Sequence, residues 1–122
     1  MLIALLTMML LGGTPTALLD DLGHVQDEVK VVMPKNDQRK AALDVLKQME
    51  KRTKDQNKQV DGFRKGMQKL LSAHAFSTDP IDQMWGDYHD TRAAFQRDMI
   101  DLRFELKEHV SRAEWEQIFD GS

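Results

Sequence analysis

The sequence predicts an all-α fold, an elongated antiparallel helical hairpin with short flanking helices. Of its 122 residues 30% are charged, while only seven are glycine and three are proline, a composition typical of helical domains. Two long segments, about 37–75 and 80–109, carry apolar side chains at steps of three and four residues, which places each set on one helix face. The few residues between them leave room only for a reversal. Because so polar a chain buries only a thin seam, we also expect a homodimer.

Two apolar stripes define the seam along which the long helices should pack. The first comprises Leu46, Met49, Thr53, Val60, Phe63, Met67, Leu70 and His74, and the second Ile81, Met84, Tyr88, Phe95, Met99, Leu102, Leu106 and His109. Both drift slowly around the helix, as a coiled-coil seam does. Between Lys51 and Gln59 the first stripe has almost no apolar residue, so we expect the seam to fail there and this segment to face solvent or a partner.

The N-terminal residues 1–19 are predicted to form a signal peptide or an N-terminal membrane anchor. They hold no charged side chain, and an apolar run from Leu2 to Leu11 is followed by Gly12, Gly13 and Pro15. An apolar run of this length before helix breakers is typical of an export signal. In a Gram-negative cell we therefore expect the protein in the periplasm. Without cleavage, the segment is just long enough to anchor the chain in the inner membrane, facing the periplasm.

Residues 20–122 are predicted to form a single helical domain, with helices at about 20–33, 37–75, 80–109 and 112–119. The first helix ends at Pro34, and Asn36 or Asp37 provides the N-cap of the second. Gly62 and Gly66 weaken the second helix by about 1 kcal/mol each relative to alanine. They would also allow another helix to approach closely, but we interpret both as tolerated surface glycines.

The last two helices have clear start signals. Asp79 caps the third, with Pro80 at its first position. Ser111 and Glu114 are spaced as a capping box, which predicts the short final helix. Its apolar tip, Trp115 to Phe119, must dock on another element, and we expect that to be the base of the hairpin near the first helix.

The two long helices carry opposite charge. Between Lys35 and Leu71 there are eleven Lys or Arg against five Asp or Glu, a net of +6, whereas from Ser77 to Ser122 there are five against eleven, a net of −6. One interpretation is that the arms attract each other and fix their register, at a few tenths of a kcal/mol per exposed pair. The other is that the basic arm presents a cationic surface to acidic clients, phospholipid headgroups or a sensor domain.

The basic arm is the predicted partner-binding surface. Its candidate residues combine cations with apolar side chains of the first stripe: Lys47, Lys51, Arg52, Lys54, Lys58, Phe63, Arg64 and Met67. The expected partners are unfolded or envelope proteins and a sensor domain. Nucleic acid is not expected, because the whole chain has a net charge of −3 and is exported.

The sequence indicates neither catalysis nor an organic cofactor. Without cysteine, disulfides, thiolate zinc sites and cysteine catalysis are excluded. There is no glycine-rich phosphate loop and no serine beside a histidine and an acid, and a thin hairpin lacks an enclosed site. A metal ion is the alternative, with His24, His74, His89 and His109 as candidate ligands beside Met33 and Met67. No two of these histidines stand three or four residues apart, the spacing of a helical two-histidine site.

The segment Val110 to Phe119 looks like a divergent form of a Leu-Thr-x-x-Gln motif, with Ser111 for Thr and Glu114 for Gln. With the order of helices over residues 20–119, it resembles the Spy and CpxP type of periplasmic stress proteins, together with the related heavy-metal sensors and zinc-resistance proteins. The resemblance implies an all-helical, often dimeric, cradle-shaped protein that binds unfolded clients or a sensor kinase.

Three functions follow as hypotheses. The first is an exported chaperone or envelope-stress adaptor that works without ATP, through a basic and apolar surface. The second is a periplasmic metal-responsive sensor or resistance protein. The third is a coiled-coil structural subunit of an envelope assembly.

Overall fold

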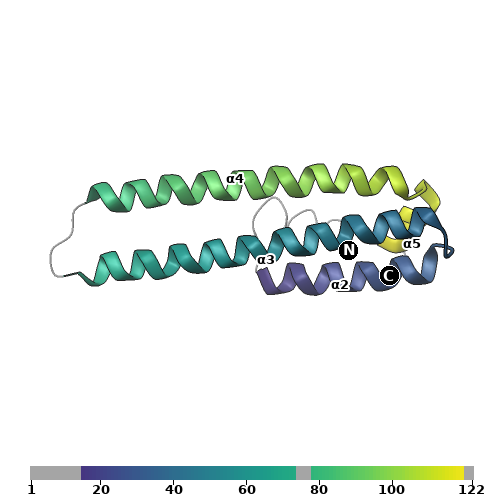
Figure 1. Ribbon diagram of the computed structural model, residues 1–122, viewed down its shortest axis with the longest axis horizontal. Helices are drawn as coiled ribbons and strands as arrows, with labels where there is room; N and C mark the ends of the chain where they lie inside the picture. The colour runs from purple at the N-terminus through teal and green to yellow at the C-terminus, as the bar shows by residue number, and fades with distance from the viewer. Residues whose placement is uncertain (1–14, 74–77, 120–122) are drawn as a thin grey trace.

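The computed structural model describes residues 15–73 and 78–119 of the chain. This part contains four helices and no strand: α2 (Pro15–Val32), α3 (Asp37–Ser72), α4 (Thr78–His109) and α5 (Arg112–Phe119) (Figure 1). The predicted all-α helical hairpin is confirmed, with α3 and α4 as its arms.

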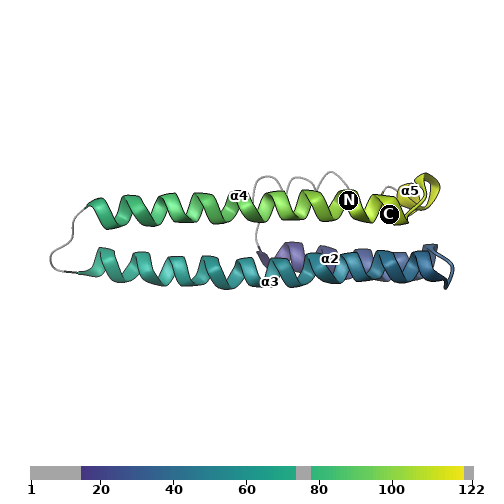
Figure 2. The same cartoon turned by 45° about the horizontal axis from the view of Figure 1, so that its top comes forward.

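The hairpin has two halves of different thickness. The arms α3 and α4 lie antiparallel along their whole length, whereas α2 lies beside only the half of α3 nearest the α2–α3 turn (Figures 1 and 2). At that end α5 folds back and contacts α2. We call this the bundle half. The distal half, residues 57–72 of α3 and 78–94 of α4, consists of two helices alone among the described residues.

The hydrophobic core fills the bundle half. The buried side chains come from all four helices and the turns beside them: Leu18, Leu22, Val25, Val29, Met33, Ala42, Val45, Leu46, Met49, Phe95, Met99, Leu106, Val110, Ile118 and Phe119. Each fully buried Leu, Val, Met or Phe stabilises the fold by about 1.5–3 kcal/mol relative to exposure. The tip of α5 docks against α2 in this core, as its apolar residues require.

Local capping explains the helix ends. The Asn36 side chain accepts a hydrogen bond from the Arg39 backbone N–H at 3.0 Å, so Asn36 is the N-cap of α3. The capping box of α5 forms as predicted, with Glu114 N–H donating to Ser111 Oγ at 3.2 Å and Ser111 N–H donating to Glu114 Oε1 at 3.1 Å. α3 ends at Ser72, three residues earlier than predicted, whereas α4 begins at Thr78, two residues earlier than predicted. Asp79 therefore lies in the first turn of α4, and its predicted role as the N-cap is wrong.

The first helix begins earlier than the sequence suggested. α2 starts at Pro15 instead of residue 20, because proline suits a first helical turn and Leu18 extends the apolar stripe one turn before Leu22. Leu18, which the sequence placed in the 1–19 leader, is buried in the core. The apolar run Leu2 to Leu11 lies outside the described residues. Among the described residues, no helix combines the length and apolar character needed to span a bilayer.

The two glycines of α3 have different surroundings. A Cβ on Gly66 would lie 2.9 Å from Met84 Cε of α4, while a Cβ on Gly62 would have no such neighbour within 4 Å. Gly62 is therefore a tolerated surface glycine, as expected. The same interpretation is wrong for Gly66, which faces the contact between the arms.

We predict different effects of alanine at these two positions. Gly62→Ala should stabilise the protein by about 1 kcal/mol, roughly 4 °C in Tm, because it only raises helix propensity. Gly66→Ala should gain clearly less, since the end of the Met84 side chain must move. Thermal unfolding followed by circular dichroism measures both, and equal gains would contradict the placement of Gly66 between the arms.

Candidate partner-binding surface

Side-chain burial stops halfway along the hairpin. The buried residues of α3 end at Gln56 and those of α4 begin at Phe95, and no described residue of 57–73 or 78–94 is buried. This limit coincides with the start of α2, which lies beside the middle of α3 (Figures 1 and 2). Two helices can cover only part of each other's apolar stripe, so the seam beyond this point stays accessible to water.

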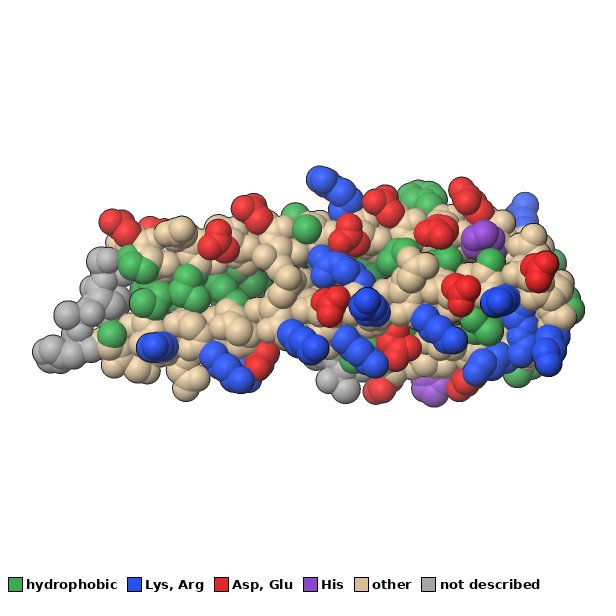
Figure 3. Space-filling model, viewed as in Figure 1, with side chains coloured by type: hydrophobic (Ala, Val, Ile, Leu, Met, Phe, Trp, Pro, Cys, Tyr) green, Lys and Arg blue, Asp and Glu red, His purple; other side chains and the backbone are tan. Residues whose placement is uncertain are grey.

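The accessible residues form what we call the distal seam. It comprises the half-buried Val60, Phe63, Met67, Leu70, Ile81, Met84 and Tyr88, with the more exposed Leu71 and Trp85 at its edge. Leu71 is 56% exposed and Trp85 is 47% exposed. Figure 3 shows apolar side chains open to solvent between the two arms toward their connecting end. Contiguous exposed apolar surface of this kind marks an interaction site more often than scattered single residues do.

An aromatic cluster forms the centre of the distal seam. The Phe63 ring stacks on Tyr88 with centroids 4.7 Å apart and meets the edge of Trp85 at 5.6 Å. Trp85 also contacts Tyr88 at 5.9 Å, and His89 lies at the border of the cluster. Such ring pairs contribute about 0.5–1.5 kcal/mol each beyond area burial, so the cluster holds the arms together where α2 gives no support.

A shallow hollow of about 230 Å³ adjoins this cluster. It is lined by Gln59, Val60, Phe63, Asp87, Tyr88 and Thr91. Trp85 was not among the predicted site residues, because it lies beside Met84 and off the counted stripe. Its spacing of three residues from Tyr88 was the available signal.

The predicted cationic residues are arranged around the basic arm but have different roles. Lys47, Lys51, Lys54, Lys58 and Arg64 are exposed on α3. Arg52 is more enclosed: its Nε donates to Asp98 Oδ2 at 2.8 Å, and its Cζ lies 5.4 Å from the Phe95 ring centroid. Its guanidinium therefore joins α3 to α4.

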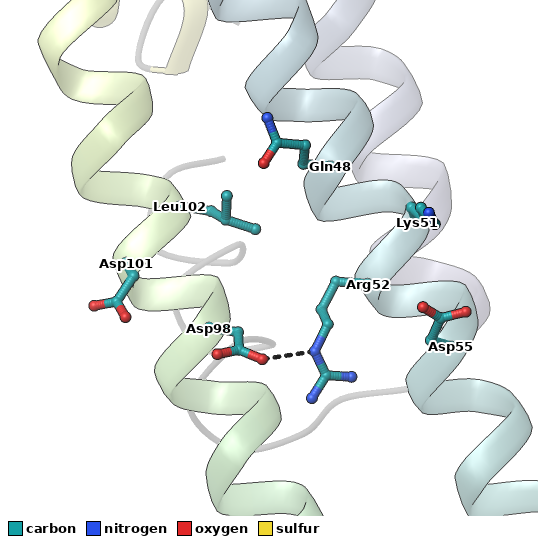
Figure 4. Close-up of a pocket in the computed structure, with 7 residues that line it drawn as sticks. All are labelled: Gln48, Lys51, Arg52, Asp55, Asp98, Asp101 and Leu102. Carbon is teal, nitrogen blue, oxygen red and sulfur yellow. Dashed lines mark hydrogen bonds and ion pairs between the residues drawn. The ribbon is translucent and has the colours of Figure 1, made fainter.

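A hollow of about 450 Å³ surrounds this ion pair (Figure 4). Its lining residues come from both arms: Gln48, Lys51, Arg52, Asp55, Asp98, Asp101 and Leu102. Figure 4 shows Arg52 reaching across to Asp98, while Asp101 points away from it. With three carboxylates against two cations, this hollow is not the cationic surface expected from the sequence.

Other ion pairs run along α3. Lys54 lies 3.1 Å from Glu50, and Asp61 pairs with Arg64 at 2.7 Å and with Lys65 at 3.1 Å. Hydrogen bonds from Gln26 and Lys54 lower the pKa of Glu50, and those from Lys65 and Arg64 lower the pKa of Asp61. The Gln26 bond, 2.9 Å long, also ties α2 to α3. Several cations of the basic arm are therefore paired with carboxylates of the same helix.

The seam continues through the polar stretch from Lys51 to Gln59, so the predicted interruption is wrong. Thr53 and Gln56 are buried, at 1% and 7% exposed, because steps of four, three and four residues carry the stripe from Met49 through them to Val60. Thr53 Oγ1 donates to the Met49 carbonyl at 2.8 Å. Gln56 Oε1 is buried and accepts no hydrogen bond from the described residues.

We predict that Gln56→Leu stabilises the protein by about 1–2 kcal/mol, because it removes a buried acceptor that lacks a donor. Urea unfolding measures the change. Gln48→Leu, at an exposed position of the same helix, is the matched control and should stay within about 0.5 kcal/mol of wild type. A loss of stability in Gln56→Leu, or a gain no larger than that of the control, would contradict the observed burial.

The predicted histidine ligands are not gathered in one place: among the described residues one lies on α2 and two lie twenty residues apart on α4. His24 is exposed on α2, His89 borders the aromatic cluster, and His109 is in the last turn of α4. His74 lies outside the described residues. Met33 is in the core. Within residues 15–73 and 78–119, no group of three or more His, Asp or Glu residues is arranged to hold a metal ion.

Comparison with protein-family models, with curated proteins and with solved structures gives no significant match for this chain. The resemblance to the Spy and CpxP type therefore stays a prediction from the sequence.

Proposed function

We propose that this protein is an exported helical binding protein that acts as an ATP-independent stress chaperone or envelope-stress adaptor. One observation carries the proposal: the distal seam, with its aromatic cluster, is left half exposed because α2 accompanies only the bundle half. The export signal predicted from Leu2 to Leu11 supports a periplasmic location, with an inner-membrane anchor as the alternative.

The packing of α2 in the bundle half supports a mode of client binding. There α2 lays one apolar stripe along the hairpin and buries it in the core. An apolar or amphipathic segment of a client would take the equivalent place on the distal seam, as in helix-in-groove recognition. With about 1.5 Å of rise per residue, the distal half offers a docking length of roughly 25 Å. Its apolar area is modest, so binding should be weak and reversible, as a chaperone without nucleotide requires.

Charges on both sides of the distal seam assist the approach of clients. Lys58, Arg64, Lys65 and Lys69 lie exposed along α3, and Asp79, Asp82, Asp87 and Asp90 lie exposed along α4. Opposite charges on the two borders steer segments of either sign and weaken with salt. The same complementarity suits a second copy turned end for end, which makes a homodimer the competing occupant. If the suppression of client aggregation per molecule falls as the protein concentration rises, a second copy is competing with the client for the distal seam.

We predict that the protein suppresses aggregation of an unfolding model client at low ionic strength, and less so at high salt. Trp85→Ala should weaken this activity about tenfold, because an exposed aromatic side chain that a client buries contributes more than 1 kcal/mol. Light scattering of a reduced, unfolding client measures the effect.

Phe104→Ala is the matched control. Phe104 is also an exposed aromatic residue of α4, at 55% exposed, but it lies in the bundle half. It should leave the suppression of aggregation unchanged. The proposal fails if the wild-type protein lets the client aggregate at low ionic strength, or if both variants lose activity equally.

A further inference from the structure

Another pocket lies at the opposite end of the molecule from the distal seam, in the corner between the last turns of α4 and the start of α5. It has a volume of about 570 Å³ and is lined by Arg103, Lys107, Val110, Arg112, Trp115 and Glu116. Pockets of this size hold small molecules. Three of the six lining residues are cations, although α4 and α5 belong to the acidic part of the chain.

Arg103 has an unfilled hydrogen-bonding requirement in this pocket. Its Cζ lies 5.5 Å from the Trp115 ring centroid, a cation–π contact that holds the guanidinium in place. Its Nε is buried and has no acceptor among the described residues. A buried donor without an acceptor costs about 1–3 kcal/mol.

The acid in the pocket does not neutralise the three cations. Glu116 pairs with Arg112 at 3.4 Å, but the Arg112 side chain is 94% exposed, and such surface pairs contribute little. Arg112 is therefore able to turn toward a ligand.

Helix stabilisation does not explain the grouping. Cations in the last turn of a helix interact favourably with its dipole, which accounts for Lys107 near the end of α4. Arg103 lies before that turn. Arg112 stands at the first position of α5, where the dipole disfavours a positive charge. Helix dipoles thus do not account for the positions of Arg103 and Arg112.

We propose that this pocket binds the phosphate group of a small soluble phosphomonoester. The Arg103 guanidinium offers parallel N–H donors that match two phosphate oxygens. Lys107 and Arg112 add positive charge from α4 and α5. Val110 and Trp115 form an apolar wall for the group that carries the phosphate. The site does not depend on the distal seam, so it stands or falls separately from the chaperone proposal.

Inorganic phosphate is the probe that tests this site. In the full chain carrying Trp85→Phe, Trp115 is the remaining tryptophan and reports on the pocket. We expect a saturable change in its fluorescence as phosphate replaces chloride at constant ionic strength. Arg103→Gln and Lys107→Gln should each weaken binding about tenfold, as expected for lost hydrogen bonds or contacts to a charged ligand.

Arg97→Gln is the matched control, since Arg97 is an exposed arginine of α4 that does not line the pocket. It should bind phosphate as tightly as the parent chain. Lys107 is exposed, so its variant tests the site even if Arg103→Gln fails to fold. Fluorescence that does not saturate, or equal weakening by Arg97→Gln and Lys107→Gln, would overturn the proposal.

Discussion

The length of α2 is the constraint on which the rest of the structure depends. Two packed helices shield only one face of each other, and water leaves the seam between them only where a third helix covers it. α2 has 18 residues, while α3 has 36 and α4 has 32. Within residues 15–73 and 78–119, a third helix therefore covers only half of the hairpin. The buried core that stabilises the fold lies in the bundle half, and the apolar surface available for binding lies in the distal half.

Polar side chains mark the boundary between these halves. Thr53 and Gln56 occupy seam positions there, and the Arg52–Asp98 pair crosses between the arms at the same level. The ion pair is partly exposed and contributes little energy on its own. Its geometry instead restricts which residues of α3 can face which residues of α4. A mismatch by one turn would leave the Arg52 guanidinium without its carboxylate and Gln56 against a different surface.

The sequence predicted the fold well because its signals are local. Apolar periodicity located both arms, and Asn36, Ser111 and Glu114 marked helix ends through hydrogen bonds to their own neighbours. Gln56 was missed because polarity was taken as exposure, although its position in the helical repeat placed it on the seam. The pocket at Arg103 was also missed. It depends on how the start of α5 is placed against the last turns of α4, which no local pattern encodes.

The residues of the candidate site could be predicted only in part, because local patterns do not show how the helices are placed relative to one another. Phe63 and Met67 belong to a counted stripe and lie in the distal seam, but the stripe could not show that burial ends beyond Gln56, because that depends on where α2 lies. The charge split likewise did not distinguish Arg52, which joins the arms, from Lys51 beside it, which is exposed. Distances between elements, not spacing along one helix, decide these roles.

Native-state hydrogen exchange at low protein concentration tests the central claim most directly. Backbone amides of 42–56 and 95–106 should exchange only through global unfolding. Those of 60–70 and 81–92 should exchange through a local opening that is lower in free energy by about 2 kcal/mol or more, since fewer buried contacts hold them. Equal protection along the full length of α3 and α4 would contradict the account, because it would mean that the distal half needs no third helix to be as stable as the bundle half.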